Sequence, residues 1–264
     1  MPVTTLNGSK IHFLDSANGK REVVVLLHAF PLHSGMWARQ VAGLSARYRV
    51  IAPDYPGLGK SEPRPSPSTM DELARDVLGI LGNLGIDRTA VAGISMGGYV
   101  AFELYRQRPG LFRGLALCDT RAGADTPEGA QNREAFAKNA LEKGLSWVAD
   151  EMAPKLLKPQ PDPAAVAEVR RLVGEGTPAG VAAAQRGMAL RPDSTPTLAK
   201  IACPTLVVCG REDGLTPVAE SEKLAAAVKG ATLAVVPSAG HLSPIENGEA
   251  VTKALSDFFG SLPR

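Results

Sequence analysis

Residues 93–97 read Gly-Ile-Ser-Met-Gly, a G-x-S-x-G pattern that could carry a nucleophilic serine. An apolar run at 89–92 precedes the pattern and a helical segment from Gly98 follows it, so we predict a strand, a sharp turn and a helix around Ser95. That setting is typical of a nucleophile elbow. The alternative is a glycine-rich loop with an incidental serine. Because a lone serine hydroxyl is a weak nucleophile, the prediction requires a base elsewhere in the chain.

One of the four histidines is suitably placed to be that base. His241 lies in the loop 238–244, between the last predicted strand and the last predicted helix. In a parallel sheet this loop reaches the carboxyl edge, on the same side as Ser95. The alternative for His241 is a surface histidine without a role. His12 belongs to an early strand that we expect at a sheet edge, so we predict a half-exposed structural side chain there.

Two aspartates could orient the histidine. Asp119 and Asp213 both follow predicted strands, and both lie between Ser95 and His241 in the chain. The order serine, acid, histidine is that of α/β-hydrolases, but it does not separate the two candidates. The segment 210–217 carries a glycine on each side of Asp213, which leaves that carboxylate free to project. We therefore favour Asp213 and keep Asp119 as the alternative.

The segments around these residues alternate between short apolar runs and helical patterns. Consecutive apolar positions are typical of strands that helices cover on both faces of a parallel sheet. Thr69-Met-Asp-Glu is a capping box that opens a helix, and Thr216-Pro217 is expected to cap another. The predicted strands lie at about 11–14, 23–28, 48–53, 89–94, 111–118, 204–209 and 232–237.

The strand pattern is interrupted once. Between residues 120 and 196 no strand is indicated, and short helices are expected at 128–143, 145–157, 163–174 and 178–190. We therefore predict a doubly wound α/β core from residues 1–119 and 197–264, with residues 120–196 as a helical cap over its carboxyl edge.

Composition limits the classes of partner. A net charge of +2 over 264 residues, without a cluster of basic residues, argues against nucleic acid. No signal peptide or membrane span is evident, and Cys203 and Cys209 lie about 20 Å apart along one predicted strand, too far for a disulfide. We expect reduced thiols and a cytoplasmic protein, either a monomer or a small homo-oligomer. No metal or cofactor motif is present, so no cofactor is expected.

Taken together, the motifs resemble the α/β-hydrolase superfamily. The chain is similar to small bacterial carboxylesterases and to 3-oxoadipate enol-lactonase-like hydrolases, and the segment 118–128 looks like that of thermophilic short-chain esterases. The resemblance implies an oxyanion hole made by the backbone N–H groups of Phe30 and Met96. It also implies that His28 fixes the loop before Phe30, where Ala29 replaces the family's glycine. The matching segments are 28–37, 54–61, 93–98 and 240–242.

The expected chemistry is hydrolysis of a short-chain carboxylic ester, a small-molecule substrate, through an acyl-enzyme. Enol-lactone hydrolysis and perhydrolysis are alternatives on the same residues, and a small-ligand receptor is an alternative of another class. Trp37 and His33 could line the acyl side of the pocket, or they could pack the loop. Trp147 and Met152 belong to a group of apolar cap residues that either line a pocket of limited size or seal the cap onto the sheet.

Overall fold

The core of the protein is an eight-stranded sheet in which six neighbouring strands run parallel. The computed structural model describes residues 2–17, 19–20, 22–65 and 67–263. The strand order is β1-β2-β4-β3-β5-β6-β7-β8, and only the pairs β1–β2 and β2–β4 are antiparallel. The mostly parallel sheet predicted from the sequence is confirmed. Its strands are β1 (Val3–Leu6), β2 (Ser9–Asp15), β3 (Val23–Leu27), β4 (Arg49–Pro53), β5 (Thr89–Ile94), β6 (Phe112–Cys118), β7 (Thr205–Gly210) and β8 (Thr232–Val236).

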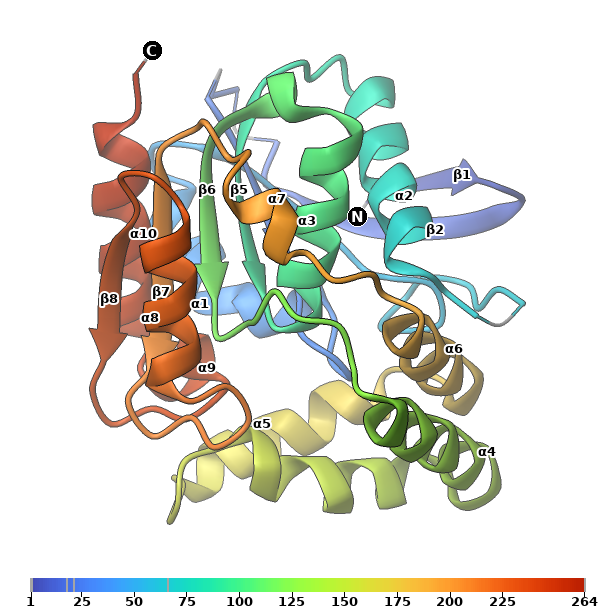
Figure 1. Ribbon diagram of the computed structural model, residues 1–264. Helices are drawn as coiled ribbons and strands as arrows, with labels where there is room; N and C mark the ends of the chain where they lie inside the picture. The colour runs from blue at the N-terminus through green and yellow to red at the C-terminus, as the bar shows by residue number, and fades with distance from the viewer. Residues whose placement is uncertain (1, 18, 21, 66, 264) are drawn as a thin grey trace.

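Helices cover both faces of the sheet. Every residue of β3, β5 and β7 is buried, which explains why these strands are apolar without alternation. In Figure 1, α3 and α8 lie in front of the sheet, whereas α1 and α10 lie behind it. The elements of the two layers are η1 (Ser34–Trp37), α1 (Ala38–Leu44), α2 (Met70–Asn83), α3 (Met96–Gln107), η2 (Pro109–Leu111), α7 (Thr195–Leu198), α8 (Val218–Ala227), α9 (Ser243–Glu246) and α10 (Gly248–Ser261).

Three further helices lie across the carboxyl ends of the central strands. The arrowheads of β5 and β6 point toward this layer, which consists of α4 (Pro127–Leu156), α5 (Pro163–Gly174) and α6 (Pro178–Ala189) (Figure 1). Each helix begins with a proline, whose fixed φ suits the first helical turn. Gly144, with a φ of 78°, divides α4 into two arms, close to the break expected between 143 and 145.

The antiparallel end of the sheet differs from the sequence expectation. We predicted no strand before residue 11, yet β1 pairs with β2 and places β2 inside the sheet. His12 is therefore buried, not half-exposed, and its Nδ1 lies 2.7 Å from the carboxylate of Asp54. Among the helices that the structure describes, none is both long and apolar enough to cross a membrane.

Candidate active site

Ser95 occupies a strained turn between β5 and α3. Its φ of 52° is rare for a residue with a side chain. A Cβ on Gly93 would lie 2.3 Å from the carbonyl oxygen of Gly97, and a Cβ on Gly97 would lie 2.2 Å from that of Leu27. Side chains at these two positions would collide with backbone, so the turn requires glycine on both sides of the serine. The elbow therefore follows directly from the G-x-S-x-G pattern.

The structure brings Ser95, His241 and Asp213 together in a line. His241 Nε2 lies 2.8 Å from Ser95 Oγ, and His241 Nδ1 lies 2.8 Å from Asp213 Oδ2. A carboxylate can only accept, so Nδ1 carries the proton and Nε2 is free to accept the serine proton. A serine paired with a histidine that a carboxylate orients is an arrangement suited to acyl transfer.

The carboxylate of Asp213 is held ionised by its neighbours. Burial raises its pKa, but the hydrogen bonds and charge of His241, together with hydrogen bonds from Thr216, outweigh burial and leave the pKa below the ordinary value. Oδ1 accepts from the backbone N–H groups of Leu215 and Thr216 at 2.8 and 2.9 Å, and the Thr216 hydroxyl donates to Oδ2 at 2.5 Å. Thr216 was predicted to cap α8, but its hydroxyl serves the carboxylate, and α8 has no side-chain cap.

Asp119, the alternative acid, makes no hydrogen bond to His241 in the described part of the chain. Its Oδ1 accepts from Gly210 N–H at 2.7 Å and its Oδ2 contacts the Ser243 hydroxyl at 2.6 Å. Burial and the nearby charge of Asp213 raise the pKa of Asp119 well above its usual range. Asp119 therefore ties the end of β7 to the start of α9, and the geometry favours Asp213 as the partner of His241.

The loop after β3 brings Phe30 next to the serine. Phe30 lines the same cavity as Ser95 and His241, and Met96 begins α3 directly after the elbow. Within the described part of the chain, no hydrogen-bond acceptor is found for the N–H of Phe30 or of Met96. The substitution of Ala29 for glycine causes no strain, because Ala29 does not have a positive φ.

The side chain of His28 fixes the loop after β3 that carries Phe30. Its Nε2 accepts the backbone N–H of Tyr55 at 3.1 Å, so the proton lies on Nδ1, which is 3.0 Å from the carbonyl oxygen of Ala29. Burial of the imidazole lowers the pKa of His28 to about 4. His28 is thus neutral at physiological pH and links two loops without touching Ser95.

The cavity beside the serine is small. Its volume is about 140 Å³, and it lies between the carboxyl edge of the sheet and the cap. The side chains that line it come from the elbow, the histidine loop and the cap helices. They belong to Phe30, Ser95, Tyr99, Arg121, Arg133, Met152, Leu156, Gln185, Met188, Leu215, Thr216 and His241.

Of the residues predicted to contact the substrate, some line the cavity and others lie outside it. Met152 lines the cavity, as expected. Trp147 does not; its ring packs on Phe136, with centroids 4.9 Å apart, and Phe136 in turn contacts the ring of Phe30 in the cavity wall. Trp37, the last residue of η1, does not line the cavity either, because its side chain is fully buried in the hydrophobic core. His33 also lies outside the lining, where its Nε2 is 3.0 Å from Glu175 of the cap.

Sequence reasoning missed polar residues that support the site. The side chain of Glu246 accepts the backbone N–H groups of Gly240 and Lys158 at 2.7 and 3.0 Å, which ties the histidine loop to the end of α4. Arg121 and Arg133 line the cavity, although the sequence shows no cluster of basic residues. Arg121 follows the end of β6 by three residues, a position at the carboxyl edge that could have identified it. Among the described residues, no group of His, Cys, Asp or Glu is arranged to hold a metal ion.

This fold and this Ser–His–Asp geometry define a class of protein. A sequence model of the α/β hydrolase fold matches residues 22–248, and the chain belongs to that family. It is 30% identical to 3-oxoadipate enol-lactonase 1 of Acinetobacter baylyi, over 98% of this chain and 97% of that protein.

Solved structures agree with this assignment. A thermophilic esterase from Thermogutta terrifontis superposes with a TM-score of 0.93 at 38% identity, over 98% of this chain and 96% of the esterase. An enol-lactonase from Burkholderia xenovorans superposes with a TM-score of 0.90 at 30% identity, over 98% of this chain and the whole of that one. The relatives thus include both esterases and enol-lactonases.

Replacement of the two aspartates distinguishes their roles. We expect Asp213→Asn to lower kcat by about 10⁴-fold, because an amide favours the wrong tautomer of His241. Asp119→Asn should keep most activity, since an amide can still accept from Gly210 and donate to Ser243. Steady-state kinetics of the two purified variants provide the measurement. An active Asp213→Asn enzyme beside an inactive Asp119→Asn enzyme would reverse the assignment.

The pKa of His28 predicts a loss of stability in mild acid. The unfolded chain binds a proton at His28 near pH 6.5, whereas the native protein does so only near pH 4, so lowering the pH favours unfolding between these values. At pH 5 this amounts to about 2 kcal/mol. Denaturant unfolding at pH 7.5 and pH 5 should therefore show a smaller decrease for His28→Gln than for the wild type. Equal decreases would contradict the prediction.

Proposed function

We propose that this chain is a serine carboxylesterase that hydrolyses short-chain carboxylic esters through an acyl-enzyme. The observation that carries the proposal is the unbroken hydrogen-bonded line from Ser95 through His241 to Asp213, which opens on a cavity. The α/β-hydrolase family membership supports a hydrolytic reaction, and the esterase from T. terrifontis is similar over almost the whole chain.

Each residue has a definite task in the proposed reaction. His241 takes the proton of Ser95 as the serine oxygen attacks the carbonyl carbon, and Asp213 stabilises the imidazolium. The N–H groups of Phe30 and Met96 donate to the oxyanion, each contributing about 3 kcal/mol to transition-state stabilisation. His241 then protonates the departing alcohol and later activates the water that hydrolyses the acyl-enzyme.

The size of the cavity supports small substrates. A cavity of about 140 Å³ is close to the roughly 150 Å³ of an engineered cavity that binds benzene. Met152, Leu156 and Met188 give it apolar walls, which suit a short acyl chain. We place this site between a core of residues 1–119 and 197–264 and a cap of residues 120–196, in a cytoplasmic monomer or small homo-oligomer without a cofactor.

Enol-lactone hydrolysis is the second candidate. Two relatives named as enol-lactonases match this chain at 30% identity along nearly its full length. The same serine, base and oxyanion donors would open a lactone, with the enol oxygen as the leaving group. Perhydrolysis would use the same acyl-enzyme with peroxide in place of water.

A substrate series tests the esterase proposal. We expect the rate of hydrolysis of p-nitrophenyl esters to be highest at short acyl chains, and Ser95→Ala to lower kcat by about 10⁶-fold. Ser256→Ala, on α10, is the matched control and should retain wild-type activity. An enol-lactone assayed in parallel separates the two candidates. A rate maximum at long acyl chains would overturn the short-chain proposal.

Active-site labelling separates an enzyme from a small-ligand receptor. A fluorophosphonate should label Ser95 rapidly and with one-to-one stoichiometry, because His241 activates the hydroxyl. In a parallel assay of unlabelled protein, ester hydrolysis should continue for many turnovers per site that the probe can label. Complete labelling with only a single turnover would instead favour a receptor.

A further inference from the structure

The cavity beside Ser95 has a charge imbalance that ester hydrolysis does not require. Arg121 and Arg133 both line it, whereas no Asp or Glu does so among the residues that the structure describes. Arginine remains protonated in proteins, so the cavity wall carries two fixed positive charges. A neutral short-chain ester would have no use for either of them.

A single carboxylate behind the wall holds three arginines. Asp125 lies 2.8 Å from Arg191, accepts from Arg121 at 3.3 Å and also accepts from Arg133. Burial raises the pKa of Asp125, but Arg133 and Arg191 outweigh this effect and keep the pKa below its usual value. One negative charge therefore faces three positive charges, which leaves a net charge of +2 in the cluster.

The three arginines differ in how many of their guanidinium N–H donors have a hydrogen-bond acceptor. Arg133 also donates to Gln185 at 2.9 Å, and Arg191 donates to two backbone carbonyl oxygens and stacks 4.3 Å from the ring of Tyr99. Arg121 makes only the 3.3 Å bond to Asp125 among the described residues, and its buried Nε has no acceptor. Arg121 thus retains donors for a further group.

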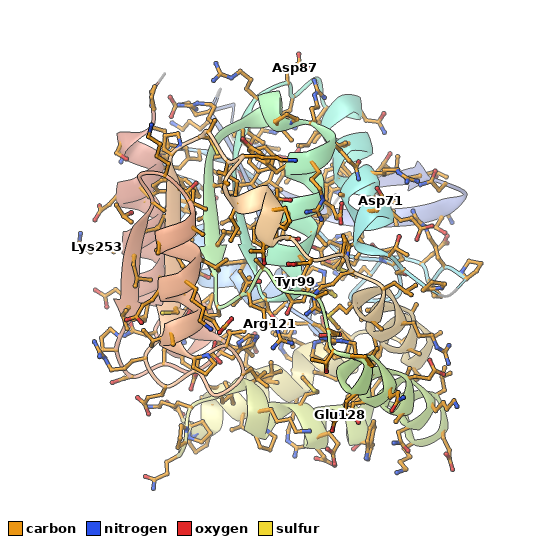
Figure 2. All side chains as sticks on the ribbon, in the orientation of Figure 1. Asp71, Asp87, Tyr99, Arg121, Glu128 and Lys253 are labelled. Atoms are coloured by element: carbon orange, nitrogen blue, oxygen red, sulfur yellow. The ribbon has the colours of Figure 1, made fainter. Side chains whose placement is uncertain are left out.

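Arg121 is also in the right place to meet a substrate. It follows β6 at the carboxyl edge of the sheet, and Figure 2 shows it with Tyr99 between the sheet and the cap helices. Its side chain is 39% exposed, so a ligand in the cavity can reach it. A planar guanidinium with free donors matches the geometry of a carboxylate, and the partly enclosed cavity strengthens such a pair.

We propose that Arg121, supported by Arg133, forms a carboxylate-binding subsite beside Ser95. The preferred substrates are then short esters or lactones that carry a carboxylate a few bonds from the scissile carbonyl. This inference rests on the proposed hydrolase function for its consequence in catalysis. The subsite itself is a binding site that can be measured without turnover.

A matched pair of esters tests the specificity. Monomethyl succinate carries the carboxylate, and methyl 4-oxopentanoate replaces it with a neutral acetyl group of similar shape. We expect Arg121→Gln to lower kcat/KM for monomethyl succinate by about 10- to 100-fold, with kcat/KM for the neutral ester changed less than twofold. Arg121→Lys should recover part of the loss, and Arg170→Gln, on α5, is the surface control.

The position of the carboxylate can be tested with a third substrate. O-Acetylglycolate carries the charge on the alcohol side, so an effect of Arg121→Gln on this ester alone would place the subsite on that side. An effect on monomethyl succinate alone would place it on the acyl side. Equal losses for charged and neutral esters, or no loss for either charged ester, would overturn the proposal.

Binding without chemistry separates this proposal from the proposed function. In the Ser95→Ala protein, calorimetry should detect succinate binding, and the added Arg121→Gln change should weaken it by about tenfold or more. If no ester is hydrolysed but this difference is found, the hydrolase proposal fails and the subsite stands. If esters are hydrolysed but succinate binds equally with and without Arg121, the subsite fails alone.

Discussion

The site depends on a strained backbone at Ser95. A non-glycine residue in such a conformation costs of the order of 1–3 kcal/mol, so the surroundings must hold it in place. Two of the contacts that do so come from the end of β6, the neighbour of β5 in the sheet, and from the residues just after it. The Ser95 N–H donates to the backbone carbonyl oxygen of Cys118 at 3.0 Å, and the Thr120 hydroxyl donates to the Ser95 carbonyl oxygen at 2.8 Å. The sheet thereby fixes the serine oxygen before any substrate is present.

The loop 238–244, which carries His241, is held in place by contacts with both the core and the cap. Gly240 lies so close to the backbone of Lys158 that a Cβ there would be 2.5 Å from its nitrogen. Leu242 donates to the carbonyl oxygen of Leu156 at 2.9 Å, on the C-terminal end of α4. The position of His241 is therefore determined partly by the cap. A change in how the cap packs on the core would also change the alignment of His241 with Ser95.

Local signals in the sequence are sufficient for the parts of the site that one segment determines. The elbow follows from the two glycines around Ser95, and the breaks between the cap helices follow from prolines and Gly144. The choice between Asp119 and Asp213 needs distances across the sheet edge, which spacing along the chain does not provide. The sequence also left Trp37 open between lining the pocket and packing the loop, because a short 3₁₀ turn, which its spacing does not reveal, decides whether it faces the cavity or the core.

The two buried aspartates near the site show how environment divides one residue type into two roles. Besides the bond from His241, Asp213 accepts hydrogen bonds from the Leu215 N–H, the Thr216 N–H and the Thr216 hydroxyl, and its pKa is lowered. Asp119, fully buried near that charge, has its pKa raised, so the two carboxyl groups are not forced to be ionised side by side. Asp119 nevertheless contacts Gly210 and Ser243, which lie three residues before Asp213 and two residues after His241. Its contribution is to hold the acid and the base at the correct separation, because it joins the two loops that carry them.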